Sequence, residues 1–210
     1  VDMDTNRITG LALIGPPVIA LIIWFIFGFV SMDGVGPDDA QKFIAKLAEN
    51  SDVAKILLPA VTLLFLMAVG GTGYIKKSME GGSGHYIASF GWFLILIGAA
   101  GQLGETALTV ATAEAAADGN MGVASSMFAG SSAIGATTTA FSMLGFALIG
   151  VAILQQKNFN PLVAGLMIIA GIYTLAMCLI DYESPLIGIG YIAVVVSFVG
   201  LGAGLLTKKE

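Results

Sequence analysis

The chain has 210 residues, of which 57% are hydrophobic and only 11% are charged, and its mean hydropathy is +0.91. Soluble domains carry about 25% charged residues, so this composition excludes an ordinary soluble domain and predicts an integral membrane protein. The net charge of −5 argues against nucleic-acid binding, which requires clusters of basic residues.

The first predicted membrane span covers residues 8–30. It is longer than the about 7–15 apolar residues of a signal peptide, and no convincing small-x-small cleavage site follows it. We therefore expect a retained helix, which the Pro16-Pro17 pair should kink.

A short amphipathic helix is predicted over residues 38–50, after the first span. Asp38 or Asp39 can cap it, and its apolar residues recur at helical spacing. The helix either lies along the membrane surface or packs on the bundle, and the sequence leaves both alternatives open.

Five further spans are predicted, and each approaches or exceeds the about 20 residues that cross a bilayer. Transmembrane β-strands are about half as long and alternate in polarity, so helices are favoured. The fourth span is overlong, so part of it should tilt or stand outside the hydrocarbon core. The predicted fold is an all-α bundle of about six transmembrane helices in one domain, residues 1–210. The five spans cover residues 56–75, 86–112, 123–154, 162–180 and 186–206.

The distribution of Lys and Arg predicts the orientation. With six spans, one side of the membrane holds both termini and six basic residues, and the other side holds three. The positive-inside rule then places both termini in the cytoplasm of a cell-membrane protein. Most acidic residues fall on the outer side, where they either attract cations or simply remain after basic residues are kept inside; we favour the second reading. The six basic residues on the side of the termini are Arg7, Lys76, Lys77, Lys157, Lys208 and Lys209. The three basic residues on the other side are Lys42, Lys46 and Lys55.

Several short motifs occur along nearly the whole chain: Arg7-x-x-Gly10-Leu11, Asp39-Ala40, Ala48-Glu49-Asn50, Asn158-Phe159-Asn160-Pro161-Leu162-x-x-Gly165, Ala170-Gly171-Ile172-Tyr173 and Asp181. Their order and spacing resemble a widespread prokaryotic family of six-helix integral membrane proteins that is classified only as a domain of unknown function. The resemblance implies a fold and a topology but no activity. Many members carry Phe-Pro where this chain has Asn160-Pro161, and members tend to be more basic around the third helix, where this chain has Gln102 and Glu105.

Glu105 is the best candidate for a functional residue, because a carboxylate within hydrocarbon costs several kcal/mol unless it is paired, hydrated or protonated. It shares one face of the third span with Gln102 and Thr109. One interpretation of this intramembrane polar site is a proton or cation site. The other is a polar clasp between helices or a side chain that reaches the headgroups, and the position near the outer end of the span favours it.

The third, fourth and last spans are rich in small residues, which allow membrane helices to approach closely. The hydroxyl side chains between Ser125 and Ser142 indicate either a hydrophilic path or tight packing, and we favour packing. The Gly200-x-x-x-Gly204 motif is expected to face outward as a seam between subunits. The predicted helix-packing residues are Gly98, Gly101, Gly130, Gly135, Gly200 and Gly204.

No catalytic residue, metal site or cofactor is predicted. The chain has one cysteine, Cys178, and one histidine, His85, which are too few for the usual zinc, copper or iron–sulfur ligand sets. The sequence therefore predicts a non-enzymatic structural or accessory protein in a homo-oligomer or a larger membrane complex, with the lipid bilayer and other membrane subunits as partners. The alternative is a small-solute or ion transporter that uses the polar face of the third and fourth helices.

Overall fold

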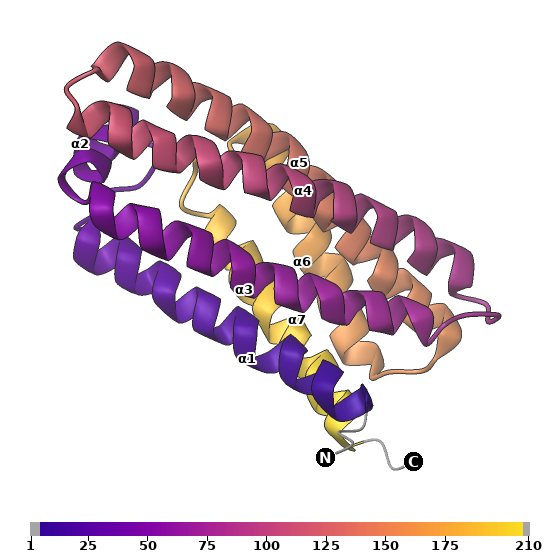
Figure 1. The fold of residues 1–210 in the computed structure, drawn as a ribbon. Coiled ribbons are helices and arrows are strands. Elements are labelled where there is room, and N and C mark those ends of the chain that lie inside the picture. Colours follow the sequence, from indigo (N-terminus) through magenta and orange to yellow (C-terminus); the bar gives the residue numbers. More distant parts are fainter. Residues whose placement is uncertain (1–4, 208–210) are drawn as a thin grey trace.

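The computed structural model describes residues 5–207, which form helices and no strand (Figure 1). Six helical stretches are long and apolar enough to cross a membrane, the first being α1 continued by the π-helical turn η1. This confirms the predicted all-helical architecture with six candidate spans. The elements are α1 (Thr5–Ile26), η1 (Phe27–Ser31), α2 (Ala40–Glu49), α3 (Ser51–Lys77), α4 (His85–Ala117), α5 (Met121–Gln156), α6 (Pro161–Ile180) and α7 (Ile187–Thr207).

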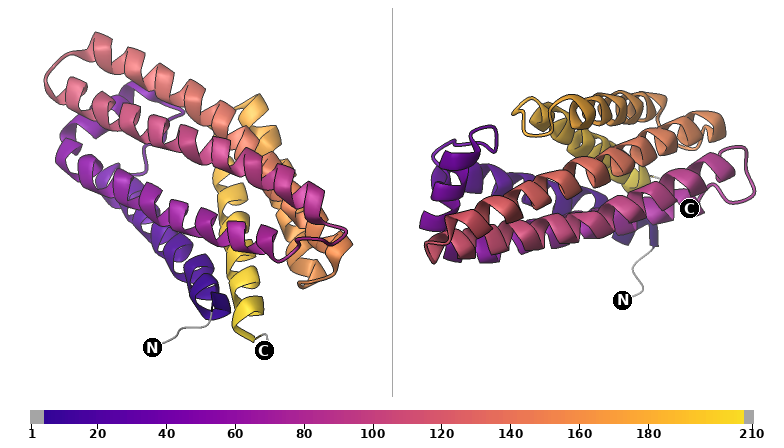
Figure 2. Two further views of the ribbon diagram at one scale, coloured as in Figure 1. Left: turned by 45° about the vertical axis from the view of Figure 1, so that its right-hand side comes forward. Right: turned by 90° about the horizontal axis from the view of Figure 1, so that it is seen from above.

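The six long helices form a closed ring in which each helix packs on two neighbours. The order around the ring is α4, α5, α6, α7, α1 and α3, and α3 returns to α4 (Figures 1 and 2). Side chains of these helices fill the interior, among them Leu13, Ile75, Ile149 and Leu201, each at most 1% exposed. Helices that are distant in sequence, such as α1 and α7, therefore lie side by side.

The first turns of α1 and the last turns of α7 lie together at one end of the ring. A Cβ atom added to Gly202 would lie 2.6 Å from the carbonyl oxygen of Gly10, so the two backbones nearly touch there. Glycine permits this approach because it has no side chain. Because the number of long helices is even, α7 ends at the same end of the bundle at which α1 begins, as Figure 1 shows.

The short helix α2 packs on the bundle. Its N-cap is Asp39, whose side chain accepts a hydrogen bond from the Lys42 backbone N–H at 3.3 Å, as expected. Ile44 is buried against α4 and α5, and the ring of Phe43 lies 5.6 Å from that of Phe128. Of the two alternatives for this helix, the structure thus shows the packed one.

Local sequence explains where α5 ends and α6 begins. Lys157 closes α5 in the left-handed conformation (φ 56°), and its N–H donates to the carbonyl of Ile153 at 2.7 Å. Pro161 then opens α6, and the Asn160 side chain accepts from the Leu162 N–H at 2.9 Å.

The long helices differ in length, and this difference positions the candidate site. Helix α4 has 33 residues and α5 has 36, whereas α6 has 20. At about 1.5 Å per residue, the first two exceed 49 Å and α6 measures only about 30 Å. The α4–α5 hairpin therefore extends past the end of α6 toward α2 (Figure 1). The connection between α6 and α7, residues 181–186, consequently meets α4 and α5 partway along their length.

Candidate functional site

Glu105 is hydrogen-bonded to a residue from a distant part of the chain. The hydroxyl of Tyr182 donates to Glu105 Oε1 at 2.7 Å. Glu105 lies on α4, whereas Tyr182 lies in the 181–186 connection. The carboxyl group is therefore at the level of this connection, and the bond joins α4 to the α6–α7 pair.

Gly135 on α5 provides the space for this hydrogen bond. A Cβ atom at Gly135 would collide with Glu105 Oε1 and would lie 2.6 Å from the Tyr182 hydroxyl oxygen. Real Cβ atoms essentially never approach other heavy atoms so closely. Three elements, α4, α5 and the 181–186 connection, thus meet at one point, which we call the Glu105 clasp (Glu105, Tyr182 and Gly135).

The residue after Tyr182 makes a second bond to the same hairpin. The Ser132 hydroxyl on α5 donates to Glu183 Oε1 at 2.7 Å. Neighbouring residues of the connection therefore bind two different helices, α4 through Tyr182 and α5 through Glu183. The connection is fixed across the α4–α5 hairpin by two hydrogen bonds to carboxyl groups, which are stronger than bonds between neutral groups when the carboxyl is ionised.

Thr109 and Ser131 join α4 to α5 directly. Their hydroxyl oxygens lie 2.7 Å apart, and both hydroxyls also contact the backbone carbonyl of Glu105, at 2.9 Å from Thr109 and 3.1 Å from Ser131. The hydroxyls of the sequence-predicted polar face are thus used in packing the two helices at this point. Thr109 belongs to the site through the backbone of Glu105 and not through its carboxyl group.

Gln102 differs from the other predicted site residues. Its Oε1 atom is buried and has no hydrogen-bond partner among residues 5–207. It lies one turn before Thr106, which contacts Thr62 of α3 at 2.7 Å, and three residues before Glu105. Helical spacing therefore places Gln102 between the α3-facing side of α4 and the clasp. An unpaired buried amide oxygen is costly, so this atom is the site's unsatisfied acceptor.

Tyr182, Ser132 and Glu183 were not among the predicted site residues. The sequence carries a weak signal for two of them, because Asp181-Tyr182-Glu183-Ser184 is a polar run between two short apolar segments. Nothing in the sequence pairs this run with Glu105, from which Tyr182 is separated by 77 positions.

The phenol of Tyr182 remains a hydrogen-bond donor at physiological pH. Burial, with a further contribution from the neighbouring Tyr191 and Glu105, raises the pKa of this phenol well above its usual value. The carboxyl group of Glu105 thus faces a neutral hydroxyl, and it forms no ion pair within residues 5–207. In this arrangement the carboxyl group of Glu105 accepts a hydrogen bond from Tyr182 and so holds α4 to the α6–α7 connection.

The predicted helix-packing glycines lie inside the chain's own contacts. Cβ atoms at Gly98 and Gly101 would collide with Ser142 and Thr138 of α5. These two glycines therefore allow α4 and α5 to approach closely. Gly130 is less tightly surrounded, since its nearest neighbour would be Leu108 Cδ1 at 3.5 Å.

The Gly200–Gly204 motif faces α6 and the link that precedes it, and does not form an outward seam. A Cβ atom at Gly200 would lie 2.7 Å from Val163 Cγ2, and one at Gly204 would lie 3.7 Å from Phe159 Cδ1. The expectation that this motif faces outward was wrong because the ring places α6 beside α7 within one chain.

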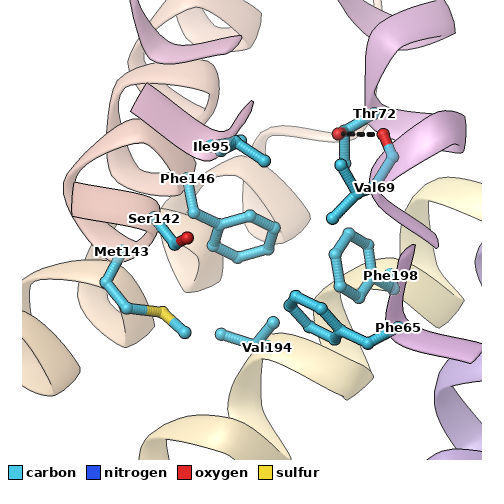
Figure 3. A pocket seen from close by; sticks show the side chains of 9 residues that line it. All are labelled: Phe65, Val69, Thr72, Ile95, Ser142, Met143, Phe146, Val194 and Phe198. Carbon is cyan, nitrogen blue, oxygen red and sulfur yellow. Dashed lines mark hydrogen bonds between the residues drawn. The ribbon is translucent and has the colours of Figure 1, made fainter. Parts of the chain in front are cut away.

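A small cavity lies away from the Glu105 clasp. It has a volume of about 20 Å³, enough for about one water molecule, and opens among α3, α4, α5 and α7 (Figure 3). The Thr72 hydroxyl at its edge donates to the Val69 carbonyl at 2.7 Å. Most of the lining is apolar, so this is a packing defect in the core. Its lining residues are Phe65, Val69, Thr72, Ile95, Ser142, Met143, Phe146, Val194 and Phe198.

Residues 5–207 contain no group of three or more His, Cys, Asp or Glu side chains that could hold a metal ion. A scan of the chain against protein-family models gave no match, and searches of curated proteins and of solved structures gave none either. The family resemblance drawn from the motifs therefore stays a prediction.

Proposed function

We propose that this protein is a non-enzymatic, multi-pass protein of the cell membrane that acts as a structural or accessory subunit of a homo-oligomer or a larger membrane complex. One observation carries the proposal: α5 presents an exposed face of small residues that its own chain leaves uncovered. Within lipid, burying apolar side chains between helices gains little, so membrane helices associate through close packing. Faces of small residues permit that close packing. The face, named here the α5 small-residue face, consists of Gly122, Ser126, Ala129, Ala133 and Thr137.

The α5 small-residue face follows one side of the helix at intervals of three or four residues. Its two hydroxyls, of Ser126 and Thr137, donate to carbonyls of their own helix at 3.0 and 2.9 Å. The face therefore offers close backbone approach without an unpaired hydroxyl. No charged residue occurs between residues 121 and 156, so nothing on α5 opposes contact with another helix.

Membrane insertion is supported by large apolar side chains exposed on every long helix, since a lipid-facing surface requires them. The six candidate spans and the excess of Lys and Arg on one side lead us to propose that both termini are cytoplasmic. Lys208 and Lys209, which contribute to that excess, lie outside the described residues. The exposed residues include Ile22, Leu63, Phe93, Phe141, Ile169 and Val196.

Cysteine labelling tests this topology. In a chain whose only native cysteine, Cys178, is replaced by alanine, single cysteines at exposed Asp52 and Asp118 should react with a membrane-impermeant maleimide added to intact cells. A cysteine at exposed Lys77 should react only after the membrane is permeabilised. Reaction of Lys77→Cys and Asp52→Cys from the same side would contradict the six-span topology.

Replacement of Ala133 by leucine tests the assembly. Because Ala133 is exposed, leucine should leave the monomer folded but separate the helices that meet at the α5 small-residue face. The expected result is a shift of the native mass in mild detergent toward a single chain, with an unchanged melting temperature. Ala176→Leu on the exposed side of α6 is the matched control and should keep the wild-type mass. Equal masses for both variants and the wild type would refute this location of the interface.

A second candidate function is transport of a small solute or ion, and the unpaired Oε1 of Gln102 is the observation in its favour. A buried acceptor without a partner is a place where a transported species can bind. The internal bonds of Glu105, Thr109 and Ser131 favour the structural role, because these groups already have partners. Flux in proteoliposomes distinguishes the two functions.

A further inference from the structure

A groove opens where α5 ends and α6 begins. It has a volume of about 340 Å³, near the lower end of the about 300–1,000 Å³ of small-molecule sites. The last turn of α5 contributes Ile153 and Leu154, the link contributes Lys157 and Phe159, and α6 contributes Pro161. Lys157 is thus the one charged residue among the five that line the groove, and the other four are apolar.

The backbone places Lys157 at the end of α5, beside the groove. Lys157 adopts the left-handed conformation that ends α5, and its N–H is bonded to the Ile153 carbonyl, also in the groove. Its side chain is exposed, and it forms no ion pair within residues 5–207. Of the lysine pair Lys76-Lys77 at the same end of the bundle, Lys76 is bridged to Glu80 at 3.3 Å, whereas Lys77 is exposed.

We propose that this groove binds an anionic phospholipid, with an acyl chain against the apolar lining and the phosphate beside Lys157. The proposal rests on the proposed insertion into a membrane, which brings this end of α5 to the headgroup layer. A lysine there keeps its ammonium group among the phosphates while its stem covers apolar surface. Basic pockets between membrane helices on the cytoplasmic side recognise anionic headgroups in this way.

A phospholipid accounts for both properties of the groove, its single positive charge and its apolar walls. A free phosphate ion would use only Lys157 and would make no use of exposed Leu154 and Pro161 beside it. A neutral lipid would use only the apolar residues and would leave the ammonium group without an anion. Exposed Leu162, the residue after Pro161, extends the apolar surface beyond the groove toward the side of α6.

Native mass spectrometry of the purified full chain tests the proposal, with phosphatidylglycerol and phosphatidylcholine offered at equal concentration. The wild type should retain phosphatidylglycerol preferentially, and Lys157→Gln should reduce its retention about fivefold, the factor that corresponds to about 1 kcal/mol for one basic residue near an anionic surface. Leu154→Glu, which places a negative charge in the groove, should reduce it as well. Lys77→Gln, at an exposed lysine of the same end, is the matched control and should retain phosphatidylglycerol like the wild type.

Three results would overturn the proposal. Lys157→Gln retaining phosphatidylglycerol like the wild type would show that the groove does not hold the headgroup. An equal loss in Lys77→Gln would show a general charge effect without a groove. Displacement of phosphatidylglycerol by inorganic phosphate would show an anion site without a lipid chain. None of these results bears on membrane insertion, which fails instead if alkaline carbonate releases the protein from membranes.

Discussion

Replacing Gly135 with alanine is expected to lower the free energy of unfolding by about 2–4 kcal/mol, because it overfills a packed site and displaces a hydrogen bond. The new methyl group would occupy the space that Glu105 Oε1 and the Tyr182 hydroxyl use. Either the 2.7 Å bond between them breaks or α5 moves away from α4. Reversible unfolding in mixed micelles measures the loss.

Gly130→Ala is the matched control for Gly135→Ala on the same helix. Its nearest neighbour would be Leu108 Cδ1 at 3.5 Å, which is an ordinary van der Waals distance. Alanine also favours a helix over glycine by about 1 kcal/mol, so this variant should be as stable as the wild type or more so. Equal stability of Gly135→Ala and Gly130→Ala would contradict the close contact at the Glu105 clasp.

Replacing Glu105 with leucine should lower the free energy of unfolding by about 1–3 kcal/mol, because the partly buried hydroxyl of Tyr182 would lose its acceptor. Glu105→Gln should cost less, since an amide oxygen can still accept the bond. In the double variant Glu105→Leu/Tyr182→Phe both polar groups are removed, so the two losses should not add. Unfolding of the wild type, Glu105→Leu, Tyr182→Phe and the double variant in one detergent gives the coupling energy. Strictly additive losses would mean that the two side chains do not interact.

The Glu105→Gln variant also separates the two candidate functions. In a structural clasp, it should leave both the melting temperature and the assembly nearly unchanged. In a proton or cation pathway, it should abolish flux in proteoliposomes while the protein remains folded. Loss of flux at an unchanged melting temperature would therefore overturn the structural role of Glu105.

The sequence predicts the helices better than their ends. The length of each apolar segment locates a membrane span, and the predicted span ends at the first charged residues. The helix itself can continue beyond that point, because charged residues are compatible with a helix. Helix α4 thus passes the predicted end at residue 112 and continues through Glu114 to Ala117, before Gly119 turns the chain at φ 80°. Helix α3 likewise begins at Ser51 and includes Lys55, before the predicted start at residue 56.

Only part of the candidate site could be predicted from the sequence. A carboxyl group in an apolar helix requires a partner, so Glu105 is identifiable from its surroundings in the sequence. Its partner Tyr182 is fixed by the packing of α6 against α5 and by the difference in their lengths, which local patterns do not encode. The orientation of Gly200 could not be predicted for the same reason, because its contact with Val163 depends on the packing of α6 beside α7 in the ring.

The native mass of the wild-type protein, taken from membranes into nanodiscs without prior delipidation, tests the proposed assembly most directly. One chain has a mass of 21.5 kDa. We predict a protein mass that is a multiple of this value, or this value plus the mass of co-purifying membrane subunits. A monodisperse single chain without partners, found in nanodiscs and in several mild detergents, would contradict the assembly and favour transport by a monomer.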